Sequence, residues 1–230
     1  NTFAEYNLTV VYLKGGSATS IEDVYSDIYT TGLIFNRTSE ATKLINNIED
    51  LLNEGKRLLS GYAGLSVLYV VGIYQGIWVA GKSTYFNDLV SRLGLKNAAE
   101  SYGWRAVSIE DIAAWRPDVV IVASMGVTRE DVEKSGLASL GAKIVYLNST
   151  ETDVLSRPSP LVALVPSVLY SALSEVIPPS TTTTTPQTAT VTYTETKTET
   201  STFTTTITIE KTAYQSSWVL ALVVLSLVIA

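Results

Sequence analysis

The sequence contains no cysteine and no histidine. Without cysteine, the chain cannot form a disulfide framework, use a thiolate nucleophile or build a structural zinc site of the cysteine type. Without histidine it lacks the commonest general base, so serine–histidine and cysteine–histidine nucleophile systems are excluded within this chain. Any catalysis would have to use carboxylates, lysine or tyrosine.

Basic residues are also scarce, since 16 Lys and Arg stand against 22 Asp and Glu, for a formal net charge of -6. Binding to a phosphate backbone requires a basic face, and none is visible in this sequence. We therefore expect no nucleic-acid partner. The length of 230 residues suits one globular domain with additional segments.

Strand-like and helix-like segments alternate in the middle of the chain. The predicted strands cover residues 66–71, 116–123 and 143–147, and the predicted helices cover 84–95, a short segment after the N-cap Ser108, 128–140 and 161–177, the last kinked or delayed by Pro166. This order is typical of an α/β domain with a central parallel sheet, here a Rossmann-like lobe.

The loops that follow the strands carry the first candidate binding residues. In a parallel sheet the loops after the carboxyl ends of the strands form the ligand crevice, and we expect Trp78, Gly81, Lys82 and Met125 there. Trp78 and Trp104, both in predicted loops, offer an aromatic wall for a flat ligand; alternatively, they fill the edge of the domain. Lys82 would meet an anionic ligand group or remain a solvated charge.

The stretch from Gly76 to Ser83 matches the phosphate-loop pattern G-x-x-x-x-G-K-[ST] and precedes a predicted helix. Three features oppose a nucleotide site. Two residues separate the pattern from its strand, bulky Trp78 lies inside it, and Asp118 is at the wrong end of the partner strand to bind magnesium. Because the pattern matches but these features oppose it, we keep a phosphate-loop NTPase only as an alternative hypothesis.

The first 60 residues predict a strand and two helices. Leu8 to Leu13 reads as a strand, and a helix follows from the N-cap Ser20 to near Phe35. An amphipathic helix over residues 38–59 would be roughly 30 Å long. It is either a strut between two lobes or an ordinary surface helix. Because a lone strand cannot bury both faces, we infer that the strand belongs to a domain that begins upstream.

The last 52 residues, after Pro178, differ in composition. Residues 179–213 are mostly threonine and resemble an O-glycosylated stalk, because they contain too few apolar residues for a core. Residues 214–230 are apolar and uncharged, with Tyr214 and Trp218 as interfacial anchors, and predict a transmembrane helix. A buried core helix is the alternative.

Three N-glycosylation triplets, at Asn7, Asn36 and Asn148, agree with exposure outside the cytoplasm. Glu110, in the first turn of the helix after Ser108, either compensates the helix dipole or serves as an exposed docking carboxylate. Its neighbour Asp111 diverges from it by about 100° around the helix, which disfavours a concerted acid–base pair.

The order of these segments resembles the solute-binding proteins of ABC importers for cobalamin, ferric siderophores and haem, whose two lobes are joined by a long helix. The resemblance covers roughly residues 1–177. Its matching segments are SEATKLINNIE (39–49), VLYVV (67–71), AGKSTYFNDL (80–89), GLKNAA (94–99), VSIEDI (107–112), RPDVVIV (116–122) and RPSP (157–160).

The resemblance implies a domain organisation. Residues 1–20 would end an amino-terminal lobe that is mostly absent from this sequence, residues 21–59 would contain the backbone helix, and residues 60–178 would form the carboxy-terminal lobe. A Thr-rich stalk and a carboxy-terminal anchor resemble the archaeal manner of tethering such receptors.

The resemblance also assigns roles to single residues. Trp78 and Trp104 stand at positions where relatives contact their ligand, and Glu110 stands at the position of the carboxylate that docks onto the permease. We therefore expect an extracytoplasmic binding protein that delivers a metal chelate to an ABC permease. It would have no catalytic residue, no protein metal site and no resident cofactor. A stalked structural or adhesion protein at the cell surface is a further alternative.

Overall fold

The computed structural model describes residue 6 and residues 9–178. These residues belong to one compact unit. Two predicted segments lie outside the described residues, namely the stalk (179–213) and the membrane anchor (214–230). Asn7, the first residue of a predicted glycosylation triplet, also lies outside them. Those three predictions are therefore not tested by the fold.

From residue 66 onward the chain contains both strands and helices, and the predicted strands at residues 66–71, 116–123 and 143–147 correspond to β1, β5 and β6. The strands are β1 (Ser66–Ile73), β2 (Ile77–Ala80), β3 (Lys96–Asn97), β4 (Trp104–Val107), β5 (Val119–Val122) and β6 (Lys143–Tyr146). The α-helices are α2 (Ile21–Ile34), α3 (Thr38–Leu58), α4 (Tyr85–Arg92), α5 (Ile109–Trp115), α6 (Arg129–Lys134), α7 (Ser149–Ser156) and α8 (Val165–Val176). Short 3₁₀ helices are η1 (Gly15–Ser17), η2 (Leu59–Tyr62), η3 (Leu137–Leu140) and η4 (Pro160–Leu164).

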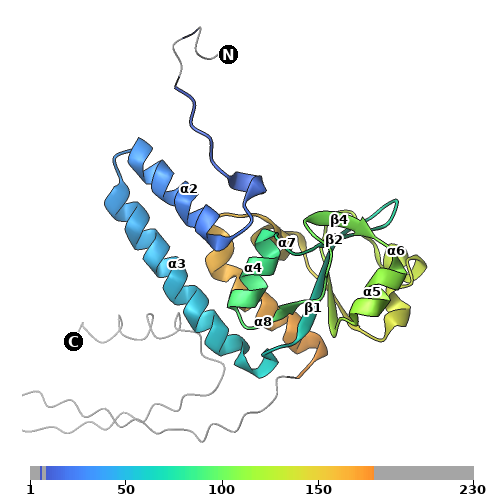
Figure 1. Ribbon diagram of the computed structural model, residues 1–230. Helices are drawn as coiled ribbons and strands as arrows, with labels where there is room; N and C mark the ends of the chain where they lie inside the picture. The colour runs from blue at the N-terminus through green and yellow to red at the C-terminus, as the bar shows by residue number, and fades with distance from the viewer. Residues whose placement is uncertain (1–5, 7–8, 179–230) are drawn as a thin grey trace, which may run out of the picture. The chain divides into compact units, whose positions relative to one another are not determined.

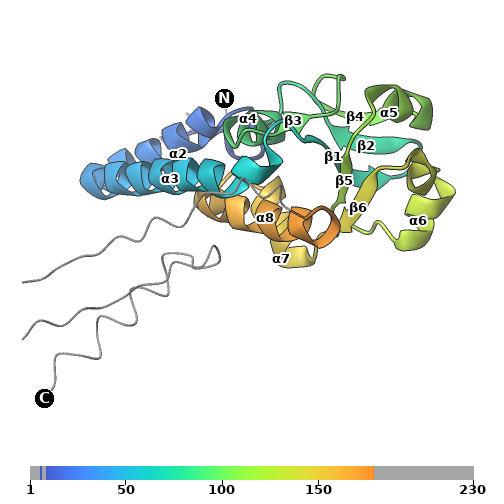
Figure 2. The same ribbon diagram turned by 90° about the horizontal axis from the view of Figure 1, so that it is seen from below.

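The strands form one mixed sheet in the order β4-β2-β1-β5-β6, with β3 paired to the first residues of β1 (Figures 1 and 2). Strands β1, β3, β5 and β6 run parallel, while β2 is antiparallel to both β1 and β4. The predicted α/β fold class with a mostly parallel sheet is confirmed. The sheet differs from the predicted one in strand β2, which lies between β1 and β4 and runs antiparallel to both.

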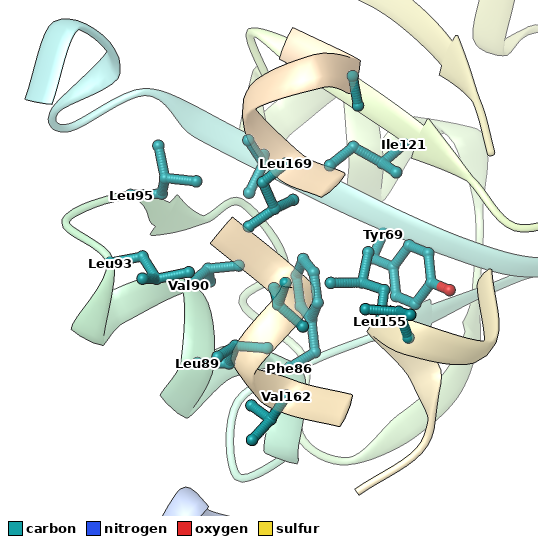
Figure 3. Close-up of a cluster of buried hydrophobic side chains, with 14 of the residues drawn as sticks. Tyr69, Phe86, Leu89, Val90, Leu93, Leu95, Ile121, Leu155, Val162 and Leu169 are labelled. Atoms are coloured by element: carbon teal, nitrogen blue, oxygen red, sulfur yellow. The ribbon is translucent and has the colours of Figure 1, made fainter. Parts of the chain in front are cut away.

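Helices cover both faces of the sheet, and each face has its own apolar core. Helices α3, α4, α7 and α8 lie on one face, and α5 and α6 lie on the other (Figures 1 and 2). Tyr69 and Phe86 stack in the first core with ring centroids 5.0 Å apart (Figure 3). The Tyr69 hydroxyl lies 2.5 Å from the Ser156 hydroxyl, and burial raises the pKa of Tyr69 to about 12.

The two long helices α2 and α3 form an antiparallel pair that is fixed to the sheet-bearing part by polar and apolar contacts (Figure 1). The Asp88 carboxylate on α4 accepts the Ile21 backbone N–H, at the start of α2, at 2.9 Å, and the Arg92 Nε–H at 3.0 Å. On α3, Gly55 packs against Pro166 so closely that a Cβ there would lie 2.2 Å from Pro166 Cγ.

Both long helices begin and end close to the predicted residues. Ser20 is the N-cap of α2, and its hydroxyl accepts the Asp23 N–H as the capping pattern predicts. Helix α8 starts at Val165 with Pro166 in its first turn, after η4, so the delayed start predicted from that proline is confirmed.

Three predictions of local structure were wrong. Residues 9–13 have no regular structure, because none of the described strands pairs with them, and Val10 to Leu13 are exposed. Residues 148–160, between the predicted strand 143–147 and the predicted helix 161–177, are rich in Ser, Thr and Pro and predict a loop, but they contain α7, because Asn148 and Glu151 form a capping box. The predicted loops around Trp78 and Trp104 contain β2 and β4, which pair with each other.

Over the part of the chain that the structure describes, no single helix is long and apolar enough to cross a membrane. Within these described residues, α7 and residues 160–176 meet the length and hydropathy criteria as a pair, with a bend of 114° between them. Leu155, Leu169 and Leu173 of this pair are buried in the core.

The contact between α3 and α8 predicts a stability effect. Replacing Gly55 with Ala should destabilise the fold by about 1–3 kcal/mol, because the added methyl group overlaps the buried ring of Pro166. The matched control is Gly16→Ala, since a Cβ there meets nothing within 4 Å. Urea denaturation of both variants measures the difference. Equal stability of the two variants would show that the α3–α8 contact is not tightly packed in solution.

Candidate ligand-binding face of the sheet

The two tryptophans singled out in the sequence lie on neighbouring antiparallel strands. Trp78 of β2 pairs with Ala106 of β4, and Ala80 of β2 pairs with Trp104. Directly paired residues share a face, so Trp78 and Trp104 occupy diagonal positions on the same face of the sheet. The structure therefore brings these two predicted residues together.

That face is the one covered by α4 and α8, because Ala80 belongs to the core on that side. The alternate residues Ile77, Val79 and Val107 belong to the core on the opposite side, beneath α5 and α6. Trp78 is half-buried and Trp104 is 42% exposed. The part of this face that Trp78 and Trp104 occupy is therefore aromatic and partly accessible to solvent.

A third aromatic residue, Tyr74, completes the aromatic face, and it was not singled out from the sequence. Its ring stacks on Trp78 with centroids 5.4 Å apart and an interplanar angle of 21°. The Trp78 indole N–H donates a hydrogen bond to the Tyr74 carbonyl oxygen at 3.2 Å. The four-residue spacing across a turn that contains Gly76 is the signal that could have identified the pair.

Gly81 and Lys82 follow the far end of β2, away from the β1–β2 turn. Gly81 is buried, and a Cβ there would lie 2.2 Å from the Ser101 carbonyl oxygen. The N–H of Gly81 donates to the Gly103 oxygen at 2.9 Å, and that of Lys82 donates to the Ser101 oxygen at 2.7 Å. Close approach of two backbone segments therefore explains Gly81, while the Lys82 side chain is exposed.

This geometry bears directly on the phosphate-loop pattern of residues 76–83. A phosphate loop needs consecutive backbone N–H groups that are free to surround phosphate. Here Ile77 to Ala80 form a strand paired on both sides, and the next two N–H groups are also bonded within the protein. The match to the pattern does not correspond to a phosphate-loop conformation.

Met125 lies at the carboxyl edge of the sheet, three residues after the end of β5, and is 57% exposed. The expectation that Trp78, Gly81, Lys82 and Met125 share one set of loops is corrected, since β2 separates the turn that follows β1 from Gly81 and Lys82. Tyr74, Trp78 and Met125 remain the candidates nearest the carboxyl edge, whereas Trp104 pairs with Ala80 at the end of β2 that Gly81 and Lys82 follow.

Glu110 occupies the first turn of α5, where Ser108 and Asp111 form a capping box. Its side chain is exposed and, within the described residues, makes no hydrogen bond or ion pair. Among the glycosylation candidates, Asn36 is exposed in the turn between α2 and α3, with φ of 52°. Asn148 is exposed, but its side-chain oxygen accepts the Glu151 N–H as the N-cap of α7.

The sequence matches the family described as periplasmic binding protein over residues 3–156. It is also 28% identical over 157 residues to an uncharacterised ABC transporter substrate-binding lipoprotein of Bacillus subtilis. That alignment covers 66% of this chain and 50% of the relative. The chain thus spans about half the length of the curated relative it matches.

Solved structures with the same fold include two binding proteins. A periplasmic haem-binding protein of Pseudomonas aeruginosa superposes with a TM-score of 0.57 at 19% identity, covering 74% of this chain and 66% of that one. A periplasmic vitamin B12-binding protein of Vibrio cholerae superposes with a TM-score of 0.60 at 16% identity, covering 76% and 68%. At these identities the likeness shows the fold alone.

The capping box of Ser108 and Asp111 at the start of α5 predicts that the stability of the fold depends on pH. Hydrogen bonds from the Ser108 backbone N–H and hydroxyl lower the pKa of Asp111 below its usual value. Its stabilising contribution is therefore present above the unfolded pKa and is lost as the pH falls through the folded pKa. Urea denaturation from pH 6 down to pH 2 should show a smaller acid-induced loss of stability for Asp111→Asn than for the unmodified protein.

The control for that series is Glu133→Gln, an exposed carboxylate on α6 outside any capping box. Its pH profile should follow that of the unmodified protein. Identical profiles for all three proteins would mean that the capping box does not hold the first turn of α5 in solution.

Proposed function

The chain belongs to the periplasmic binding protein family, and on that basis we propose that it is the substrate-binding component of an ABC importer. It captures a metal chelate, such as cobalamin, haem or a ferric siderophore, outside the cell and delivers it to a membrane permease. The observation that carries the proposal is the exposed aromatic face formed by Tyr74, Trp78 and Trp104. Apolar walls of this kind suit large ligands with apolar surfaces.

Charge and chemistry agree with a binding role. The described residues contain no group of three carboxylates close enough to hold a metal ion. In the proposed function the metal is part of the chelate, which the protein would recognise by its organic surface. In the family to which the chain belongs, solute capture makes and breaks no bond, and we assign no catalytic residue.

We further propose that the ligand site is completed by a second lobe. An apolar groove of about 570 Å³ lies along α2 and α3, where Val24, Ile28, Ala41 and Leu44 form part of its lining. Phe35 at its end is exposed. An exposed apolar groove of this size is a usual mark of an interaction surface. The amino-terminal lobe, which ends within residues 1–20, would cover it.

In this arrangement residues 21–59 hold the strut and residues 60–178 form the carboxy-terminal lobe. Helix α3 is packed on α8 through Gly55, so the strut is fixed to this lobe. Hinge motion between the lobes would therefore be small, because a continuous helix bends less readily than a flexible linker. A lobe alone should bind its ligand weakly.

We also propose that residues 179–213 form a stalk and residues 214–230 a single-pass anchor, which hold the binding lobes at the extracellular face of the cell membrane. The composition of the two segments supports this location. The membrane attachment of a lipoprotein relative is consistent with tethering near the permease. Glycans would be accepted at the exposed Asn36 and Asn148.

The proposal predicts which chelate-binding residues matter. Calorimetric titration of the full-length protein, with its amino-terminal lobe, against cobalamin, haem and a ferric hydroxamate should reveal micromolar or tighter binding to one of them. Trp78→Ala and Trp104→Ala should each weaken that binding by about tenfold or more, since each removes a large apolar contact. Lys82→Ala, which removes an exposed side chain that follows β2 and is not aromatic, is the control and should have a smaller effect.

Other outcomes of this titration would favour other functions. Binding of ATP with magnesium that is lost in Lys82→Ala but kept in Trp78→Ala would support the NTPase alternative, against the pairing of Ile77–Ala80. If neither a chelate nor a nucleotide binds, the result would favour a structural protein of the cell surface.

Docking onto the permease is tested separately. Replacing Glu110 with Arg should reduce chelate uptake by cells several-fold without changing chelate affinity, because reversal of an exposed charge weakens association with a basic partner surface. Glu133→Arg, an equally exposed charge reversal on α6, is the matched control and should leave uptake intact. Equal loss of uptake in both variants would indicate a general charge effect instead of a docking contact.

A further inference from the structure

The turn between β1 and β2 holds Tyr74 and Trp78 as a stacked pair, with ring centroids 5.4 Å apart. Two hydrogen bonds and the conformation of the turn fix the pair. The Trp78 indole N–H donates to the Tyr74 oxygen, the Tyr74 N–H donates to the Gly76 oxygen at 3.0 Å, and Gln75 and Gly76 adopt φ angles of 51° and 124°. Because the turn fixes the two rings, little conformational entropy is lost when a ligand contacts them.

The strand beneath the pair is adapted to it. The pairing of β1 with β2 shifts between Val70 and Gly72, and Gly72 then lies opposite Trp78. A Cβ at Gly72 would lie 2.8 Å from Tyr74 Cε1, which is closer than real side chains allow. The missing side chain therefore lets the Tyr74 ring lie against the backbone. Bulges of this kind often redirect side chains next to binding sites.

The surroundings of the pair are small or aromatic. On the same face the positions beside Trp78 and Trp104 hold Ala106 and Ala80, which are their direct cross-strand partners. Arg105 pairs with Val79 and therefore lies on the opposite face of the sheet. Tyr74 is 62% exposed, so the outer part of the stack is open to solvent. The result is an aromatic surface whose direct cross-strand neighbours are small side chains.

We propose that Tyr74 is a ligand-contacting residue, and that its stack with Trp78 selects a planar conjugated chelate of the tetrapyrrole class over a globular ferric siderophore. This inference rests on the proposed function and narrows its ligand. Parallel stacking on a fixed aromatic surface brings many atom pairs into contact at once. A hydroxamate wrapped around iron is rounded and polar outside, so it touches such a surface with only a few atoms.

The test uses the full-length protein and two probes, haem as the planar chelate and ferric desferrioxamine as the globular one. Tyr74→Ala should weaken haem binding by about three- to tenfold, as expected for loss of one aromatic contact. Tyr74→Phe, which keeps the ring, should bind haem within about twofold of the unmodified protein. Tyr29→Ala removes an exposed tyrosine from α2 and is the matched control, with no expected effect.

Gly72 supplies an independent test of the geometry. In Gly72→Ala the new methyl group should displace the Tyr74 ring and weaken haem binding, although all aromatic residues remain. In a Tyr74→Ala background the same substitution has no ring to displace, and affinity should fall no further. Non-additivity of the two changes would show that Gly72 acts through Tyr74.

The outcomes separate this inference from the proposed function. Binding of ferric desferrioxamine in preference to haem would overturn the selection of a planar ligand and leave the proposed function standing. Unchanged haem affinity in Tyr74→Ala, with weakened affinity in Trp78→Ala, would overturn the role of Tyr74 alone. If neither probe nor cobalamin binds, the proposed function fails and this inference fails with it.

Discussion

The backbone pairing of β1 with β2 is the constraint on which the candidate site depends. It converts a segment that follows a buried strand into a second strand, and its register places Trp78 opposite Gly72. The pairing of β2 with β4 then places Ala106 on the other side of Trp78. The same strand pairing therefore forms the aromatic face and uses the backbone N–H groups that a nucleotide site at the phosphate-loop pattern would need.

The central part of the fold could be predicted because its signals are strong and local. Runs such as Val119 to Val122 are buried on both faces of the sheet, and their apolar residues are continuous. The hairpin strands could not be predicted in the same way. Residues 77–80 and 104–107 are four residues long, flanked by glycines and partly exposed, so their structure depends on partners distant in sequence.

The site was predictable to the same extent. Trp78 and Trp104 are recognisable as large aromatics outside any helical pattern, and the sheet brings them together. Tyr74 and Gly72 gain their meaning only from a shift of register, which no local pattern reveals. Gly81 shows the opposite case, since its position in a familiar motif suggests a ligand contact, while its buried contact with Ser101 gives it a packing role.

A fixed strut and a preformed aromatic face together determine how selectivity would be divided in a two-lobed receptor. Asp88 joins α2 to α4, and Gly55 joins α3 to α8, so the sheet and the strut form one body. A rigid body cannot adapt its aromatic surface to ligands of different curvature. This lobe would therefore select ligands by the shape of the surface that contacts the aromatic residues. The facing lobe would recognise the polar groups of the ligand.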